Sequence, residues 1–378
     1  MIRDPVAQET RLAAARRLVE DVLIPDEPRL DAEDRMSASA LAALRSHGLF
    51  GIAIPEAYGG LGLTMEEEVG LMLVLGRAAS AFRAVYALNS GATAQILLRA
   101  GTDAQKSRWL PGMASGAIIV GFALSEAEAG SDAASLRTTA RRDNDGWIIE
   151  GRKRWVTNAP IAGLLTVLAR TGGAGAPGVS AFIVGADQPG VIVQPVQAKM
   201  GMNGAEVADV VFDRCRVPAD AMIGAPGDGF KLALAGLDKT RLHLAALCAG
   251  QMERMIDEGR RHSLGRRQFG KPIAEQPVVA AMLADCAAEA LAVRCMALEL
   301  ARARDAGSLR PADAAAAKLF ATEAGGRVAD RILQVHGGEG YMRGSAIERL
   351  YRDMRLLRIL DGTSEIQRVV VARSVLAG

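Results

Sequence analysis

The segment RILDGTSEIQ, residues 358–367, places one carboxylate, Asp361, beside a glycine, two hydroxyls and a glutamate. A carboxylate of this kind can act as a general base that removes a proton from a substrate. The same residues also fit the start of a helix, because Ser364 and Gln367 have capping-box spacing and an acid before a helix favours its N-terminus. Residue types alone make the helix cap the commoner outcome. Both roles can coexist if Ser364 is the cap.

A second segment that could bind a ligand is FALSEAEAGSDAAS, residues 122–135, which follows a β-type run. It offers the hydroxyls of Ser125 and Ser131 and a tight turn at Gly130, so backbone N–H groups could approach a planar polar ligand. An ordinary strand-to-loop turn explains the same residues.

The segment KRWVTNAP, residues 153–160, places Trp155 and Thr157 on one face of a predicted strand. An indole with a hydroxyl two residues on could flank a flat heteroaromatic ring. A core tryptophan beside a surface threonine is the simpler alternative.

Two further segments could bind phosphate. RRHSLGRRQFGKPI, residues 260–273, is a dense basic cluster, and QVHGGEGYMRG, residues 334–344, has a glycine pair that would let a phosphate or ribityl chain approach the backbone. A solvated helix end also explains the basic cluster of the first segment, and a lone glycine pair is weak evidence for a phosphate site. The formal net charge of +2 gives no reason to expect a nucleic-acid partner.

Three blocks of sequence must position these segments. Residues 1–118 have helical periodicity, residues 119–225 contain short β-type runs separated by turns, and residues 226–378 return to long alanine-rich helices. This order predicts an α+β protein with an N-terminal helical domain, a middle antiparallel β-domain, as a barrel or sandwich, and a C-terminal antiparallel helical bundle.

The composition narrows the class of protein. A chain of 378 residues that is 50% hydrophobic can form a sizeable core in two or three domains. No apolar run is long enough to span a bilayer and no signal segment begins at Met1, so a cytoplasmic location is the default expectation. The four cysteines are scattered, without a CxxC pair, and therefore predict neither a metal site nor a disulfide framework.

Taken together, the segments resemble one family. FALSEAEAGSDAAS, KRWVTN, GRRQFGKPI, QVHGGEGY, ERLYRDMR and LDGTSEIQR are similar, in order and spacing, to motifs of the acyl-CoA dehydrogenases. IPEAYGGLGL and GTDAQKSRWLPGMASG extend the resemblance over nearly the whole chain. The resemblance implies an N-terminal helical domain, a middle β-domain and a C-terminal four-helix bundle. It also implies FAD as cofactor and a homotetramer.

The resemblance implies a role for each matching residue. Flavin contacts on the β-domain fall to Phe122, Leu124, Ser125, Gly130, Ser131, Trp155 and Thr157. Contacts with the FAD of a neighbouring subunit fall to Arg266, Phe269, Gln334, Gly337 and Gly338. Thr363 and Glu365 would contact the cofactor just after the base. Substrate contacts fall to Ser131, Asp238, Arg241, Leu360 and Gly362, with Asp238 and Arg241 on the CoA portion.

The base position departs from the family pattern. Most members have a glutamate where this chain has Asp361, and a smaller group carries its glutamate at the position of Thr240, which cannot be a base. Glu126 is expected to be structural and Glu128 solvated, which leaves Asp361 as the predicted base. An aspartate reaches about 1.5 Å less far than a glutamate, so either the substrate lies deeper in the site or the enzyme carries out a different reaction.

Three smaller departures accompany this one. Gly344 replaces an acidic or amide residue, Ala127 replaces the proline of the flavin loop, and Leu360 replaces the tyrosine often found before the base. Leu360 would make the space above the flavin more apolar, and Gly344 would remove a bridging contact.

The resemblance implies FAD-dependent α,β-dehydrogenation of an acyl thioester, carried by CoA or by an acyl carrier protein. An electron-transfer flavoprotein would be the electron acceptor. Relatives with an aspartate at this position include some dehydrogenases of cyclic carboxyl-CoA thioesters and the nitroalkane oxidases, so a flavin oxidase that reduces oxygen is the alternative. A non-catalytic scaffold or nucleic-acid binder with this fold is a third hypothesis, which the largely complete set of flavin contacts disfavours.

Overall fold

The computed structural model describes residues 1–377, and its elements follow the predicted order of helices, strands and helices. The first block contains α1 (Pro5–Leu18), α2 (Ile24–Glu33), α3 (Ala38–Ser46), α4 (Met65–Leu75), α5 (Ser80–Ser90), α6 (Ala92–Ala100) and α7 (Asp103–Ala114). Two of these helices begin with complete capping boxes, Thr64 with Glu67 and Thr102 with Gln105. Local sequence therefore fixes where α4 and α7 start.

The middle block forms one sheet with the strand order β6-β7-β3-β2-β4-β5-β8, and β1 pairs with β4. The strands are β1 (Val120–Ala123), β2 (Thr139–Asp143), β3 (Gly146–Thr157), β4 (Leu164–Arg170), β5 (Val179–Gly185), β6 (Val191–Val193), β7 (Val207–Pro218) and β8 (Met222–Ile223). The prediction of a purely antiparallel domain is wrong in one respect, because β4 pairs in parallel with both β1 and β2. These strands are joined by connections longer than a hairpin turn, which a parallel pairing requires.

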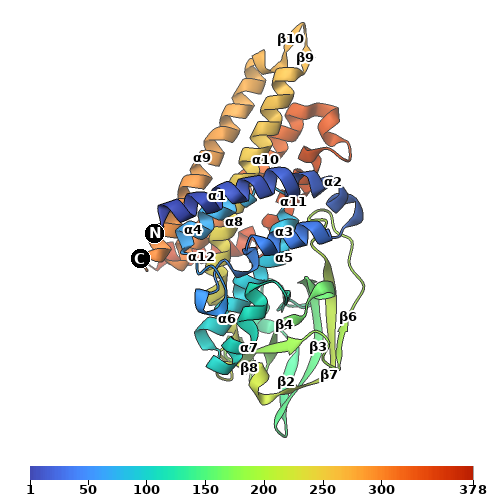
Figure 1. The fold of residues 1–378 in the computed structure, drawn as a ribbon, viewed down its shortest axis with the longest axis vertical. Coiled ribbons are helices and arrows are strands. Elements are labelled where there is room, and N and C mark those ends of the chain that lie inside the picture. Colours follow the sequence, from blue (N-terminus) through green and yellow to red (C-terminus); the bar gives the residue numbers. More distant parts are fainter. Residues whose placement is uncertain (378) are drawn as a thin grey trace.

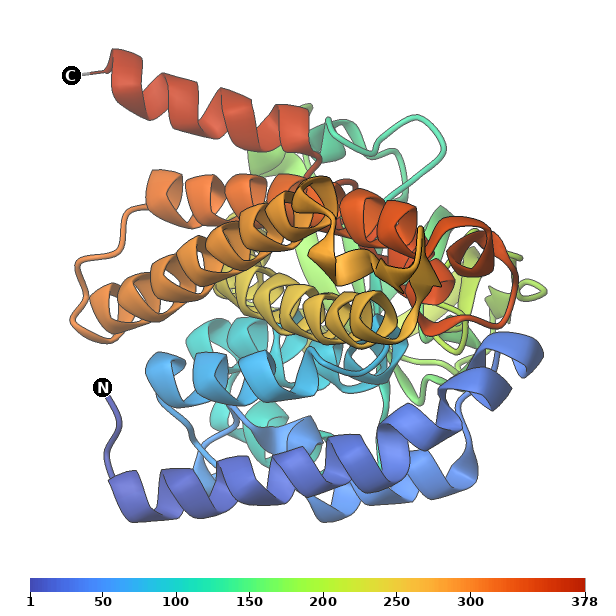
Figure 2. The same ribbon diagram turned by 90° about the horizontal axis from the view of Figure 1, so that it is seen from above.

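The third block is a helical bundle. It contains α8 (Gly229–Gly265), α9 (Pro277–Asp305), α10 (Pro311–Tyr341), α11 (Ala346–Leu357) and α12 (Ser364–Leu376), with a hairpin of β9 (Arg267–Gln268) and β10 (Lys271–Pro272) between α8 and α9. Buried alanines on α8, α9 and α10 let these long helices pack closely, as the alanine-rich sequence predicts. The sheet and the β9–β10 hairpin lie at opposite ends of the long axis (Figure 1). In the perpendicular view α1 and α12 lie on opposite sides of the bundle (Figure 2).

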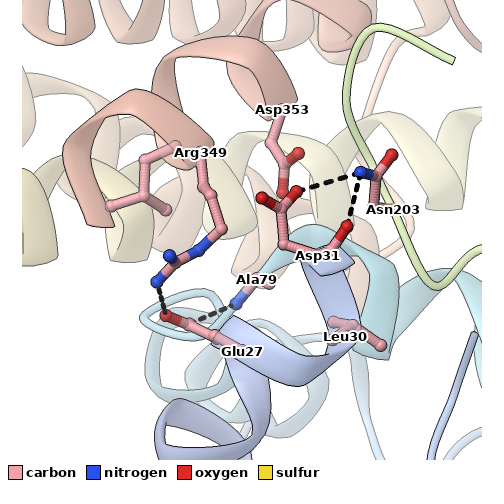
Figure 3. A pocket seen from close by; sticks show the side chains of 8 residues that line it. Glu27, Leu30, Asp31, Ala79, Asn203, Arg349 and Asp353 are labelled. Atoms are coloured by element: carbon pink, nitrogen blue, oxygen red, sulfur yellow. Dashed lines mark hydrogen bonds and ion pairs between the residues drawn. The ribbon is translucent and has the colours of Figure 1, made fainter. Parts of the chain in front are cut away.

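A buried polar cluster joins the three blocks. We call it the α2–α11 joint and define it as Glu27, Asp31, Arg349, Arg352 and Asp353. In Figure 3, Arg349 reaches Glu27, and Asn203 from the loop before β7 reaches Asp31. Arg352 donates to both Asp31 and Glu348, and Asp353 accepts a 2.6 Å hydrogen bond from the Met202 N–H. The joint fixes α11, and with it the turn that carries Asp361.

Over residues 1–377, every helix is either too short or too polar to cross a lipid bilayer.

Candidate active site

Asp361 lies in the turn between α11 and α12. Its φ is 54° and that of Gly362 is 92°, so two successive residues adopt left-handed backbone conformations. Aspartate tolerates this region better than most residues, and such strained positions gather at functional sites. The cap of α12 is Thr363, whose hydroxyl accepts from the Ile366 N–H at 3.4 Å. The prediction that Ser364 caps the helix is therefore wrong.

Two side chains hold the Asp361 turn through its carbonyl groups. Lys318 from α10 donates to the Gly362 carbonyl at 2.8 Å. Gln367 donates to the same carbonyl at 2.9 Å and to the Asp361 carbonyl at 3.3 Å. Ser364 is also used in positioning, since its hydroxyl donates to Glu323 at 2.7 Å. The backbone of the turn is thus fixed without using the Asp361 carboxylate.

The Asp361 carboxylate makes no hydrogen bond to any group in residues 1–377, and burial raises its pKa. The positive charges of three residues, Arg83, Lys318 and Arg241, oppose that rise. We call these three cations and Asp361 the base cluster. A carboxylate with a raised pKa and no hydrogen-bond donor has the properties of a general base.

The cations of the base cluster come from three helices. Arg241 lies on α8, and its guanidinium donates to Asp238 at 2.8 Å, so the two predicted substrate residues form an ion pair. Burial lowers the pKa of Lys318 to about 8, so it is largely protonated at neutral pH. The positive charge of Arg241 acts on Asp361, whereas Thr240 donates to the Gly236 carbonyl.

Sequence reasoning missed Arg83 and Lys318. Each is a single cation within an apolar or small-residue helical stretch, AFRAVY and AAAAKLFA. A buried charge costs free energy unless it is paired, so a lone cation in an apolar helical stretch indicates that the residue has a function. The fold alone shows that both cations act on Asp361.

Trp155 lies on the sheet, where a β-bulge interrupts the pairing of β3 with β7 between Lys153 and Val156. Its φ of 53° is rare for a bulky residue, and its side chain is 53% exposed although Val156 is buried. A bulge re-aims a side chain, and here it presents the indole to solvent instead of the core. Thr157, two residues on, is half-buried. The core-tryptophan alternative is therefore wrong.

The loop after β1 is held by a buried ion pair. The Lys153 ammonium donates to Glu126 at 2.8 Å and to the Leu124 carbonyl at 3.1 Å. Glu126 also accepts from two backbone N–H groups, which confirms its structural role, and Glu128 is exposed as predicted. The remaining residues of this segment are accessible: Phe122, Leu124 and Ser125 are half-buried, and Gly130 and Ser131 are exposed.

Helix α5 contacts the residue that follows β3 and also carries one cation of the base cluster. Asn158, three residues after Trp155, donates to the Ala84 and Val85 carbonyls of α5, and Arg83 precedes them on the same helix. The charges of Arg83 and Asp361 act on each other. Leu360, Gly362, Thr363 and Glu365 belong to the Asp361 turn or follow it directly.

The other predicted cofactor residues lie at the far end of the bundle (Figure 1). Phe269 in the β9–β10 turn is 93% exposed with a φ of 53°, and Arg266 beside it is exposed. Gln334, Gly337 and Gly338 lie near the end of α10, where His336 stacks on His262 of α8 at 4.4 Å between ring centroids. Within one chain these residues are therefore separated from Trp155.

These two groups fit the FAD that the resemblance implies. Trp155 and Phe269 are exposed aromatic side chains in strained backbone conformations, which suits contact with a flat ring system. A Cβ added at Gly130, Gly337 or Gly338 would meet nothing within 4 Å, so the backbone is open to a ligand at each. No group of three metal-ligating side chains occurs in residues 1–377.

Comparison with known proteins connects this geometry to a family. Family models for the N-terminal, middle and C-terminal domains of acyl-CoA dehydrogenases match residues 6–117, 121–215 and 227–376. The chain is 37% identical over 374 residues to the probable acyl-CoA dehydrogenase FadE25 of Mycobacterium tuberculosis, and the match covers 98% of this chain and 96% of that relative.

Solved structures agree with this assignment. Butyryl-CoA dehydrogenase from Megasphaera elsdenii is 29% identical with a TM-score of 0.94 over 98% of each chain. The prolyl acyl carrier protein oxidase AnaB is 30% identical with a TM-score of 0.92, and PigA, solved with FAD and proline, is 26% identical with a TM-score of 0.94, each over 98% of both chains. The chain therefore belongs to the acyl-CoA dehydrogenase family, has its fold and is an FAD-dependent oxidoreductase.

Proposed function

We propose that this protein dehydrogenates an acyl thioester between the α and β carbons and that Asp361 is the base. The observation that carries the proposal is Asp361 itself, a half-buried carboxylate of raised pKa in a strained turn, at the position where the family has its base. The thioester is carried by CoA or by an acyl carrier protein. An acyl carrier protein oxidase among the similar structures supports the second form.

The residues of the base cluster define the proton transfer. Asp361 takes the α-proton, and the electron pair of that C–H bond becomes part of the new α,β double bond. The Asp361 N–H has no hydrogen-bond acceptor in residues 1–377, so it is available to the thioester carbonyl oxygen. A donor of this kind typically contributes about 100- to 1,000-fold to the rate when negative charge develops on that oxygen. FAD, when bound, supplies the acceptor for the β-hydrogen, which leaves as hydride.

Two groups of residues would hold the cofactor. Phe122, Leu124, Ser125, Gly130, Ser131, Trp155 and Thr157 would contact the flavin end from the β-domain, and Thr363 and Glu365 would add contacts after the base. Arg266, Phe269, Gln334, Gly337 and Gly338 lie too far along the bundle to join them in one chain and would serve a neighbouring subunit. This division supports a homo-oligomer, which we propose to be a tetramer in the cytoplasm.

Asp238, Arg241, Leu360 and Gly362 would contact the substrate, together with Ser131. An electron-transfer flavoprotein is the proposed electron acceptor. The second candidate is a flavin oxidase, which the aspartate base and the similarity to AnaB favour. Rapid oxygen consumption with release of nitrite from a nitroalkane would select a nitroalkane oxidase.

Anaerobic titration of the purified yellow protein tests the proposed function. A panel of acyl-CoA and acyl-carrier thioesters is added, and the absorbance of the oxidised flavin is followed. We expect at least one thioester to bleach the flavin stoichiometrically and to yield a trans-2-enoyl product. If every thioester leaves the flavin oxidised while a nitroalkane bleaches it, a nitroalkane oxidase is the correct function. If a thioester bleaches the flavin and air then reoxidises it rapidly, the enzyme is a thioester oxidase.

A further inference from the structure

Arg83 is a buried arginine without a partner. It lies on α5 and is 9% exposed, yet its side chain forms no hydrogen bond or ion pair within residues 1–377. Its Nε is fully enclosed and has no acceptor. A buried guanidinium without an acceptor is costly, and the group remains charged at every physiological pH. The chain's own contacts therefore do not account for an arginine at this position.

The groups that face Arg83 do not neutralise it. Tyr86 on the same helix and Cys248 on α8 are neutral, because burial raises the pKa of both. His243 on α8 is neutral at pH 7, because burial lowers its pKa to about 4. Asp361 is the remaining group that acts on Arg83, and the two side chains do not approach within the 4.0 Å of an ion pair.

The cations around Asp361 differ in what they contact. Arg241 donates to Asp238, and Lys318 donates to the Gly362 carbonyl and also experiences the negative charge of Glu323. Of these three cations, Arg83 is the one without a hydrogen-bond acceptor in residues 1–377. A bound anion would complete the cluster, since buried charges are normally paired.

We propose that Arg83 binds a carboxylate at the far end of the acyl group, so the preferred substrates are short dicarboxylic acids linked through one carboxyl as a thioester. The inference rests on the proposed function, because it places the reacting α-carbon at Asp361. An arginine fork matches a carboxylate with two parallel hydrogen bonds. A plain hydrocarbon chain would leave the guanidinium buried and unpaired.

A role for Arg83 toward the flavin, or toward Asp361 alone, would lead to different measurements. If Arg83 acts on the flavin, its removal changes FAD affinity or flavin potential, whatever the acyl group carries. If it serves only to keep Asp361 ionised, its removal changes the pH profile equally for neutral and anionic substrates. A carboxylate site instead predicts a loss that depends on the terminal group of the ligand.

The test measures binding to the FAD-loaded protein with thiodiglycolyl-CoA and (ethylthio)acetyl-CoA. Both have sulphur in place of the β-carbon and therefore cannot lose a β-hydrogen, and they differ only in a terminal carboxylate or methyl group. Dissociation constants come from calorimetry and from perturbation of the flavin spectrum. A second carboxylate and methyl pair, whose acyl chains are one methylene longer, tests whether Arg83 requires a longer dicarboxylic acyl group.

We expect the carboxylate ligand of at least one pair to bind the wild type about 10- to 100-fold more tightly than its methyl counterpart, the range of a charged hydrogen-bonded contact. Arg83→Met should abolish this preference, and Arg83→Lys should retain part of it. Arg327→Met, on the exposed side of α10, is the control and should leave the preference unchanged. Equal affinities in both pairs for the wild type, or equal weakening of both ligands by Arg83→Met, would overturn the inference.

The outcome can be separated from that of the proposed function. If no thioester, neutral or anionic, bleaches the flavin in the anaerobic titration, the dehydrogenase proposal fails. If thioesters bleach the flavin but a terminal carboxylate gives no advantage in binding, only the inference about Arg83 fails.

Discussion

Helix α11 and the turn that follows it each carry a cluster of buried charge, and the two clusters differ in how fully their members are paired. In the α2–α11 joint every charged side chain has a hydrogen-bond partner. In the base cluster, Arg83 and the Asp361 carboxylate have none among residues 1–377. Charged side chains that pair with each other fix the position of a helix or turn, whereas charged side chains without a partner remain free to bind a ligand. The joint therefore supports the turn, and we propose that the base cluster acts on substrate.

The largest effect should follow from removal of the proposed base. Asp361→Asn keeps the shape of the side chain but cannot accept the α-proton, so flavin reduction by the best thioester should slow by about 100- to 10,000-fold. Stopped-flow absorbance of the oxidised flavin under anaerobic conditions measures the rate. The unfolding free energy should change little, because the carboxylate makes no hydrogen bond within residues 1–377.

Asp361→Glu is the matched control for that experiment. It retains a carboxylate and lengthens it by about 1.5 Å, so reduction should persist with an altered preference among acyl groups. Flavin reduction by Asp361→Asn at the wild-type rate would show that another group takes the α-proton.

The next largest effect concerns the joint. Arg349→Met leaves Glu27 buried with one cation fewer, and loss of one member of a buried pair costs about 3–5 kcal/mol of stability. Urea unfolding at a fixed excess of FAD measures the loss. Arg16→Met removes an exposed arginine paired with Glu9 and should cost less than about 1 kcal/mol. Equal stability of the two variants would contradict the role given to the joint.

The pH dependence of stability offers a finer test of the joint. Burial raises the pKa of Asp353 from its ordinary 3.8 to about 6. The folded state therefore holds this proton more tightly than the unfolded state, so stability is full below about pH 4 and falls as pH rises through about 6. Asp353→Asn cannot ionise and keeps an acceptor for the Met202 N–H.

Asp353→Asn should therefore gain stability relative to the wild type between pH 4 and pH 7, by at most about 3 kcal/mol. Urea unfolding across that pH range measures the difference. Asp103→Asn, at a side chain that is almost fully exposed, should show no such gain. A difference that does not change with pH would mean that Asp353 is ionised in the folded protein throughout this range.

The sequence predicted the fold and the local segments better than it predicted the base cluster. The order of helices and strands followed from patterns within short segments, whereas the accessible Trp155 and the structural Glu126 were expected only once the family resemblance was considered. Arg83 and Lys318 are recognisable in the sequence as lone cations in apolar stretches, but their effect on Asp361 could not be predicted, because it arises only when distant helices pack together. The cap of α12 was misplaced by one residue for another reason: Thr363 and Ser364 are chemically similar, and backbone angles select between them.

The smallest change in stability should come from Arg83→Met. A buried charge without a partner costs free energy, so its replacement should leave the unfolding free energy within about 1 kcal/mol of the wild type or raise it. Activity should respond in a different way. Asp361 must be ionised to act, so flavin reduction is lost as pH falls through its raised pKa, and Arg83 holds that pKa down. Without Arg83 this acid limb should move to higher pH, as measured by the pH profile of flavin reduction with a neutral thioester. Loss of several kcal/mol of stability in Arg83→Met, with an unmoved acid limb, would place Arg83 with the joint as a structural residue.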